Sequence, residues 1–465
     1  MDNPPPASVT IHTIPRPGFS PRRAASDTAV LAMRSPPSRP RGFTKSGLSP
    51  ANTSPVRVPR NLLTTFSYFA LSTPLVASRR IRGKTHHVGW DYRSEFITGF
   101  LKFSLGSPDF QQWRRLTGMG ATFGRIISRD LRIRRVKETF VDGYWISLNS
   151  ATKRAALKAK PYMTIFYLHG GGYTTGEPLM HSGAFQKLLT YLSRDHGLHN
   201  VRFFAVKYPL APEHPYPAAI NTAFDAYHWL TVLKGVDPST VVVSGDSAGG
   251  GLALSLLQMI RNASPSKGLS LPKASLLISP WLELLKEIPS HATKEITRKD
   301  YLSPRCTRPF VEAYLGNSGA SLVDPLVSPL YMDFKDIPPI MITCGGVELF
   351  RDSITSYYEK ARDAGIDVFL EVDMDMPHVY PMLVDFYGAK SRNALRKMAE
   401  WLSEIWEGDI ISSPSSTPEP KVLPKGAKTC ASPEDMWEDA DEYFPGEAPT
   451  KTASAPPLQE KTSLP

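Results

Sequence analysis

Residues 241–251 read Val-Val-Val-Ser-Gly-Asp-Ser-Ala-Gly-Gly-Gly, and this stretch decides the fold. Its first three residues form a β-branched run, which is typical of a buried strand. Gly245 and Gly249 then flank Ser247 in the pattern Gly-x-Ser-x-Gly, and the apolar run Leu252–Ile260 predicts a helix after them. Only small residues fit beside a serine in so sharp a strand-to-helix turn, so we expect the hydroxyl group of Ser247 to stand at the open edge of a sheet. The alternative is a turn rich in glycine and serine that carries no chemistry.

A second motif lies upstream, where residues 169–172 read His-Gly-Gly-Gly after the strand-like run Thr164–Leu168. Glycines let the backbone approach a ligand closely with its amide groups turned inward. Inward amides are the donors that stabilise a developing oxyanion in acyl transfer. We therefore expect the backbone N–H groups of Gly171, Gly172 and Ala248 to form an oxyanion hole. A flexible turn is the alternative interpretation of the three glycines.

A third segment, residues 208–218, reads Tyr-Pro-Leu-Ala-Pro-Glu-His-Pro-Tyr-Pro-Ala and predicts a rigid loop before a helix that begins near Ala218. Together the three segments resemble the hormone-sensitive-lipase-like branch of the α/β-hydrolases, over about residues 162–407. The resemblance implies an α/β-hydrolase fold, with a mostly parallel central sheet, helices on both faces and a helical cap over the site. Strand-like runs that alternate with helix-like stretches agree with that fold class.

A serine nucleophile needs a base, and in this fold the base comes last in the order Ser, Asp or Glu, His. Of the 11 histidines, only His291 and His378 follow Ser247. His378 comes just after the strand-like run Val368–Val372, which is the loop position that the fold requires, so it is the predicted base. His291 lies in a polar stretch with no preceding strand, and we interpret it as a solvated side chain.

The predicted acid of the triad is Glu348, which follows the strand-like run Ile340–Thr343. The family usually has Asp at this place, but Glu can also accept a hydrogen bond from the imidazole. Asp352, in the first turn of the next predicted helix, is the alternative acid. Asp246 is expected to brace the oxyanion loop, and Glu213 and His214 are expected to tie the loop structurally.

The resemblance implies a serine carboxylic-ester hydrolase that acts on hydrophobic esters. Deacetylation of sterols or small metabolites is a narrower hypothesis, which rests only on analogy with relatives. Amide or formamide hydrolysis by the same residues is one alternative. The other is a non-catalytic ligand-binding protein like the plant gibberellin receptor, although that receptor lacks the catalytic histidine, whereas this chain has His378.

Composition divides the chain into a hydrolase body and two polar ends. Both ends lack hydrophobic periodicity and are predicted to be disordered. A helical pattern runs from about Trp90 to Val136. The expected regions are a disordered basic arm rich in Pro, Ser and Arg (1–60), a helical cap region that could lie on a membrane (61–140), the catalytic domain (141–410) with a cap insertion at about 282–320, and a disordered tail (411–465).

The formal net charge is +10, and its excess lies at the N-terminus. Residues 1–90 hold 13 Lys and Arg against Asp2 and Asp27 alone, which argues against a catalytic domain that binds nucleic acid. This basic region could contact an anionic membrane peripherally. We expect an intracellular protein that is cytoplasmic or membrane-associated, for example at the endoplasmic reticulum. A mitochondrial transit peptide is an alternative, which the proline content opposes.

The cysteines and glycine motifs indicate neither a disulfide framework nor a bound cofactor. Cys306, Cys344 and Cys430 are too few and too scattered for disulfides, which favours a reducing compartment. No cysteine–histidine cluster has metal-binding spacing, and the His-Gly-Gly-Gly motif lacks the lysine of a phosphate-binding loop. We therefore expect no metal and no cofactor. The expected partner is a small hydrophobic ester, which is the substrate, and the sequence does not indicate the oligomeric state.

Overall fold

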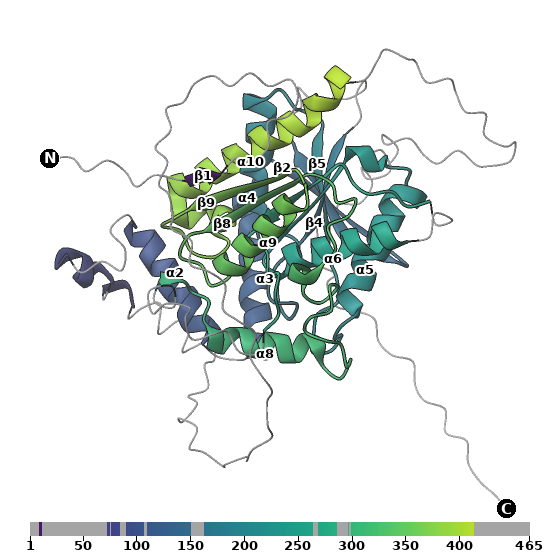
Figure 1. The fold of residues 1–465 in the computed structure, drawn as a ribbon. Helices are drawn as coiled ribbons and strands as arrows, with labels where there is room; N and C mark the ends of the chain where they lie inside the picture. Colours follow the sequence, from purple (N-terminus) through teal and green to yellow (C-terminus); the bar gives the residue numbers. More distant parts are fainter. Residues whose placement is uncertain are drawn as a thin grey trace, which may run out of the picture. The chain divides into compact units, whose positions relative to one another are not determined.

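A nine-stranded sheet runs through the part of the chain that the computed structural model describes, namely residues 9–11, 72–74, 76–83, 90–106, 109–149, 162–263, 268–285, 296 and 299–412 (Figure 1). The strand order is β1-β9-β8-β7-β6-β4-β5-β3-β2. Strands β4 to β9 are parallel, while β1, β2 and β3 pair antiparallel at the two edges. The strands are β1 (Val9–Ile11), β2 (Leu131–Glu138), β3 (Val141–Leu148), β4 (Met163–Leu168), β5 (Val201–Val206), β6 (Val241–Asp246), β7 (Ala274–Ile278), β8 (Ile340–Gly345) and β9 (Val368–Asp373).

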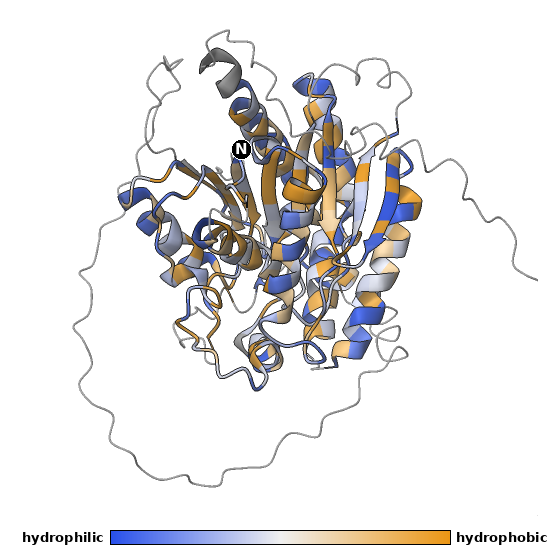
Figure 2. Cartoon of the chain, turned by 90° about the vertical axis from the view of Figure 1, so that its right-hand side faces the viewer, coloured by the Kyte–Doolittle hydropathy of each residue, from blue (hydrophilic) through white to orange (hydrophobic). Residues whose placement is uncertain are grey.

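The inner strands form because their side chains are apolar on both faces. Every residue of β4, β5, β6, β7 and β8 is buried, as expected for parallel strands with helices on either side. Figure 2 shows this pattern as orange central strands between helices of mixed colour. The predicted mostly parallel sheet of an α/β-hydrolase fold is therefore confirmed.

The helices alternate with the parallel strands and cover both faces of the sheet (Figure 1). Phe166 of β4 packs edge-on against Tyr227, whereas its neighbour Ile165 belongs to the core on the opposite side, under α4 and α10. The helices are α2 (Tyr92–Leu105), α3 (Phe110–Ile127), α4 (Ser182–Asp195), α5 (Ala218–His228), α6 (Ala248–Asn262), α8 (Pro304–Leu315), α9 (Arg351–Asp363) and α10 (Val384–Ser412).

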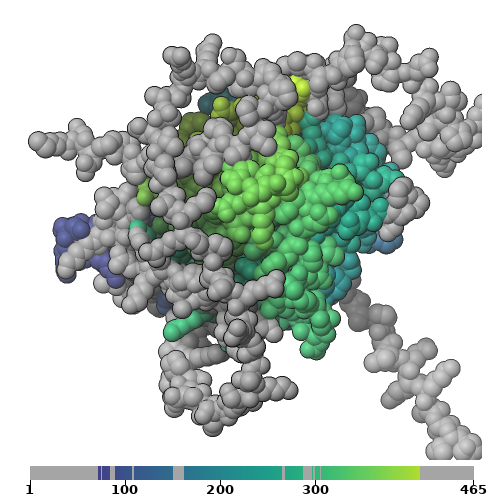
Figure 3. Space-filling view, in the orientation of Figure 1, coloured from purple at the N-terminus to yellow at the C-terminus, as the bar shows by residue number. Residues whose placement is uncertain are grey.

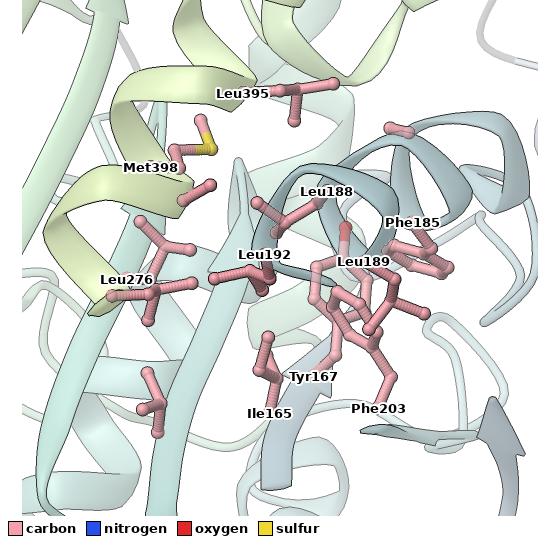
Figure 4. Packing of buried hydrophobic residues seen from close by; sticks show 14 of the residues in the cluster. Ile165, Tyr167, Phe185, Leu188, Leu189, Leu192, Phe203, Leu276, Leu395 and Met398 are labelled. Atoms are coloured by element: carbon pink, nitrogen blue, oxygen red, sulfur yellow. The ribbon is translucent and has the colours of Figure 1, made fainter. Parts of the chain in front are cut away.

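An apolar core on the α4 and α10 side joins segments that are far apart in sequence. Figure 4 shows Leu188 and Leu192 of α4 between the sheet and Met398 of α10. Leu276 of β7 completes this layer and is 1% exposed. Figure 3 shows that teal and green parts of the chain also meet on one face of the molecular surface. Burial of this core fixes the strand ends that carry the functional side chains.

Two helices near the N-terminus begin at aspartate caps. The side chain of Asp91 accepts a hydrogen bond from Ser94 N at 2.8 Å at the start of α2, and Asp109 accepts one from Gln112 N at 3.0 Å at the start of α3. The helical pattern expected to reach Val136 ends earlier, because α3 ends at Ile127 and residues 131–138 form β2. The sequence pattern of β2 misled this prediction, since four of its eight residues are Arg or Lys and only Leu131 and Ile133 pack against the core.

Some elements of the structure fall inside the other predicted regions. Residues Val9–Ile11, inside the segment predicted to be a disordered arm, form the edge strand β1 against β9. Strand β2 precedes residue 141, where the catalytic domain was expected to begin, and α8 lies within the predicted cap insertion. His291, Cys430 and the tail from residue 413 lie outside the described residues. Among the residues that are described, no helix has the length and apolar character that crossing a membrane requires.

Candidate active site

Ser247 stands in a strained turn between β6 and α6, as its motif predicts. Its backbone angles are φ 51° and ψ −121°, and its N–H donates to the carbonyl group of Ile278 at 2.9 Å. A Cβ atom on Gly249 would lie 2.1 Å from the carbonyl oxygen of Leu168, and one on Gly245 would lie 2.3 Å from that of Gly249. Both positions therefore require glycine, which is the steric reason for the Gly-x-Ser-x-Gly pattern.

His378 lies in the loop after β9, and its side chain extends from this loop to Ser247. Its Nε2 atom lies 2.9 Å from the Oγ atom of Ser247, a hydrogen-bonding distance. The imidazole is 2% exposed and packs edge-on against Phe350, with ring centroids 5.0 Å apart. The structure thus brings together the predicted nucleophile and the predicted base across 131 residues of sequence.

Glu348 is the acidic residue next to this histidine. Its Oε1 atom lies 3.5 Å from His378 Nδ1, while its Oε2 atom accepts hydrogen bonds from Ser279 Oγ at 2.6 Å and from Gly345 N at 2.7 Å. Asp352, the alternative acid, lies in the first turn of α9 and forms an exposed ion pair with Arg351 at 2.8 Å. Of the two acids, the structure places Glu348 beside the imidazole.

The glycine loop 169–172 lies against Asp246 and faces the same cavity as Ser247. Asp246 accepts a hydrogen bond from Gly170 N at 2.8 Å and another from the hydroxyl group of Tyr167. Burial by itself would raise the pKa of the Asp246 carboxyl group. The charge of His181 and the hydrogen bonds from His181 and Tyr167 lower it by more, so the pKa of Asp246 lies below its ordinary value. Asp246 therefore braces this loop, as the sequence suggested.

The three predicted oxyanion donors lie around the serine. Gly171 has φ 109°, and a Cβ atom there would meet the carbonyl oxygen of Thr175 at 2.4 Å, so this backbone conformation needs glycine. Gly171 and Gly172 line the cavity that Ser247 lines. Ala248 is the first residue of α6, where backbone N–H groups have no partner within the helix.

The proline-rich segment supports the glycine loop from behind. The ring of Tyr208 stacks on that of His169 with centroids 4.2 Å apart, and its hydroxyl group donates to the His169 carbonyl. Arg114 of α3 donates to the carbonyl groups of Thr174 at 2.8 Å and Ala211 at 2.7 Å. Glu213, predicted to be a structural tie, holds Arg114 in an ion pair at 2.7 Å.

Ser279 is a polar residue of the site that sequence reasoning missed. Its hydroxyl group donates to Glu348 and accepts a hydrogen bond from Val379 N at 3.0 Å. It therefore links the loop of the acid to the loop of the histidine. The sequence held a weak signal for it, because Ser279 ends a strand-like run beside the nucleophile strand.

Asp300 is the second such residue, and it is fully buried. Its Oδ1 atom accepts hydrogen bonds from His378 N at 3.2 Å and Tyr301 N at 2.8 Å, and its Oδ2 atom accepts one from Leu349 N at 2.8 Å. Burial raises the pKa of Asp300 to about 6. No local motif could have indicated this position, since Asp300 closes a polar stretch of the chain.

An apolar cavity of about 490 Å³ opens beside Ser247 and His378. Its walls come from α2, α3, α8 and the loops after the parallel strands, and they are rich in aromatic side chains, namely Phe100, Trp113, Phe123, Trp281, Phe310 and Phe350. Among the described residues no group of His, Cys, Asp or Glu has an arrangement that could hold a metal ion. Cys306 and Cys344 are buried free thiols.

Comparisons with known proteins agree with this fold. Residues 165–382 match a family model described as the alpha/beta hydrolase fold. An acetyl-hydrolase of Streptomyces hygroscopicus is 36% identical over 217 residues, which cover 47% of this chain and 68% of the relative. An esterase of Acinetobacter venetianus is 30% identical over 249 residues, which cover 53% of this chain and 77% of the relative.

Solved structures give the same result. A crystal structure of an esterase from the bacterial hormone-sensitive lipase family superposes with a TM-score of 0.57 at 27% identity, covering 68% of this chain and 98% of that one. The fold and the site thus define an α/β-hydrolase. The chain belongs to the hormone-sensitive-lipase-like branch of that family, as its three motifs predicted.

Proposed function

We propose that this carboxylic-ester hydrolase cleaves hydrophobic esters by transferring the acyl group to Ser247. The observation that carries the proposal is the 2.9 Å separation of His378 Nε2 and Ser247 Oγ beside an apolar cavity. At that distance a neutral imidazole can take the hydroxyl proton as Oγ attacks the ester carbonyl carbon.

The other predicted residues would act on the charges that this attack creates. Glu348 would accept the Nδ1–H of His378 and stabilise the imidazolium. The 3.5 Å distance is long, but such hydrogen bonds often shorten only when substrate binds. The N–H groups of Gly171, Gly172 and Ala248 would hold the carbonyl oxygen as it becomes negative.

The reaction would then finish in three proton transfers. The imidazolium of His378 gives its proton to the departing alkoxide, so the alcohol leaves and an acyl-Ser247 ester remains. Water, deprotonated by His378, attacks that ester. The carboxylic acid leaves, and Ser247 regains its proton from the imidazolium.

The lining of the cavity supports a substrate with a bulky apolar group. About 490 Å³ falls in the range of small-molecule sites, and the aromatic walls favour burial of an apolar alcohol or acyl part. The similarity to an acetyl-hydrolase supports a short acyl group. We therefore propose, as the narrower function, deacetylation of the acetate ester of a hydrophobic alcohol, such as a sterol or a small metabolite.

Amide or formamide hydrolysis is the second candidate, because acyl transfer from an amide uses the same nucleophile, base and oxyanion donors. A matched ester and amide of the same acyl group and the same apolar leaving part would separate the two candidates. Faster turnover of the ester supports the proposal. Faster turnover of the amide would replace it.

To test the proposal, the full chain and its Ser247→Ala variant are compared for turnover of p-nitrophenyl esters of graded acyl chain length. Labelling of both proteins by a fluorophosphonate probe is measured in parallel. We expect turnover and labelling to vanish together in the variant, with the highest activity at short acyl chains. Wild-type turnover in a folded Ser247→Ala sample would overturn the nucleophile. A maximum at long acyl chains would overturn the deacetylase proposal alone.

The composition of the N-terminal region supports a separate proposal about where the protein acts. We propose an intracellular protein whose basic N-terminal region touches an anionic membrane peripherally, because residues 1–90 carry 13 basic and two acidic residues. Attachment would place the enzyme near hydrophobic esters. Removal of residues 1–60 would lower membrane association in cell fractions, and unchanged association would contradict the proposal.

A further inference from the structure

One side of α3 exposes large apolar side chains to solvent. Phe123 is 64% exposed, Ile126 62%, Met119 46% and Ile127 42%. Single exposed hydrophobic residues are ordinary, but these four lie within nine positions of one helix. A shallow groove follows them, lined by Arg115, Gly118, Met119, Thr122, Phe123 and Ile126.

The spacing of these groove residues makes a continuous stripe along the helix. Positions separated by three and four residues lie on one helical face, so residues 115, 118, 119, 122, 123 and 126 share a side. A second stripe of α3, at residues 113, 116, 117, 120, 124 and 127, lines the cavity with Ser247 and His378. Phe123 borders both surfaces. The exposed apolar face therefore adjoins the wall of the candidate active site.

Basic side chains lie on and next to the helix that carries this face. Arg115, Arg125 and Arg129 are all exposed on or next to α3. Apolar side chains flanked by cations match the chemistry of an anionic lipid surface, where acyl chains lie below negative headgroups.

We propose that the α3 face, comprising Met119, Phe123, Ile126 and Ile127, docks on an anionic membrane and that apolar ester substrates pass from the lipid into the cavity beside Phe123. A second copy of this chain fits the face less well. A symmetric contact would bring the arginines of one copy near the same arginines of the other. Stable dimers also bury about 1,600 Å² in total, far more than four side chains supply. The passage of substrate rests on the proposed function, whereas docking does not.

The test measures binding of the full chain to vesicles of phosphatidylcholine alone and of phosphatidylcholine mixed with phosphatidylserine. The double variant Met119→Ser/Ile126→Ser removes two apolar side chains of the face that do not line the cavity. Val323→Ser is the matched control, since Val323 is a 59% exposed hydrophobic residue elsewhere. Turnover of a water-soluble ester is measured in parallel for each variant.

We expect the wild type to bind the anionic vesicles, with binding that weakens as salt rises. The double variant should bind about tenfold more weakly, because it loses the burial of two apolar side chains. The Val323→Ser control should bind like the wild type. All three should turn over the soluble ester equally, while the double variant should lose activity on an ester dissolved in the vesicles.

Three results would overturn the docking proposal. Equal vesicle binding by the wild type and the double variant would assign attachment to another region, such as the basic N-terminus. Absence of wild-type binding to the anionic vesicles would remove the membrane as partner. A wild-type dimer that becomes a monomer in the double variant would assign the face to a second copy. Vesicle binding without any ester turnover would instead count against the proposed function alone.

Discussion

The two sides of His378 are built in different ways. On the serine side, Nε2 lies 2.9 Å from Ser247 Oγ, and the turn that presents the serine follows from glycines within four residues of it. On the acid side, Nδ1 lies 3.5 Å from Glu348, and the geometry depends on Ser279 and Asp300 from other parts of the chain. A local steric motif fixes the predicted nucleophile, whereas distant polar contacts fix the predicted acid and base.

The largest expected effect tests the serine side. Ser247→Ala removes the proposed nucleophile but not the small-residue packing of the elbow, so we expect kcat on a p-nitrophenyl ester to fall by about 10⁵-fold or more. The melting temperature should change little. Steady-state kinetics and thermal denaturation measure both quantities, and a loss of folding in this variant would mean that the elbow is less locally determined than its glycines indicate.

The next prediction compares the two candidate acids. Glu348→Gln should lower kcat by about 10³- to 10⁴-fold, because the amide no longer stabilises the imidazolium or fixes its tautomer. Asp352→Asn is the matched control, and it should leave kcat within about twofold, since surface ion pairs contribute little. A greater loss in the Asp352 variant would reverse the assignment of the acid.

Asp300 provides a pH-dependent test of the acid side. Burial raises the pKa of Asp300 to about 6 from an ordinary value of 3.8, so the protonated form is favoured in the folded state. The free energy of unfolding should therefore fall by about 3 kcal/mol as pH rises from about 4 to 6. Asp300→Asn should lack this contribution when denaturant unfolding is followed across that range. An identical pH slope in wild type and variant would contradict the prediction.

The same variant should also lower activity. An asparagine supplies one acceptor oxygen, so its amide N–H₂ group would face the N–H of Leu349 or of His378 instead of accepting from it. We expect kcat at pH 8 to fall by about tenfold or more, with KM little changed, since the histidine loop loses its support. Unaltered kcat would show that Ser279 and the surrounding packing hold the loop without Asp300.

Ser279→Ala should give the smallest effect of the series. It removes a donor to Glu348 and an acceptor for Val379 N, while Gly345 N still binds the same carboxylate. We expect a loss of about fivefold to tenfold in kcat. Combined with Asp300→Asn, it should lower kcat by a factor different from the product of the single effects, because both residues support one loop.

Most of the nucleophile region was predictable from sequence because its constraints are local. A Cβ atom on Gly249 cannot fit 2.1 Å from a carbonyl oxygen, so the motif itself carries the turn. The inner strands were also predictable, since burial on both faces demands apolar runs. Strand β2 was missed, because an edge strand with an exposed face can carry as many basic residues as a surface helix.

The sequence by itself determined the fold class, the elbow at Ser247 and the order of the three predicted triad residues, because short-range sterics and hydrophobic runs are written in neighbouring positions. Only the tertiary structure brought the predicted acid Glu348 within 3.5 Å of His378, buried Asp300 beneath the histidine loop, and set an apolar face of α3 next to the cavity. These features depend on side chains separated by 30 residues or more, or on which face of a helix the core leaves uncovered. Such relations arise only when distant segments pack together.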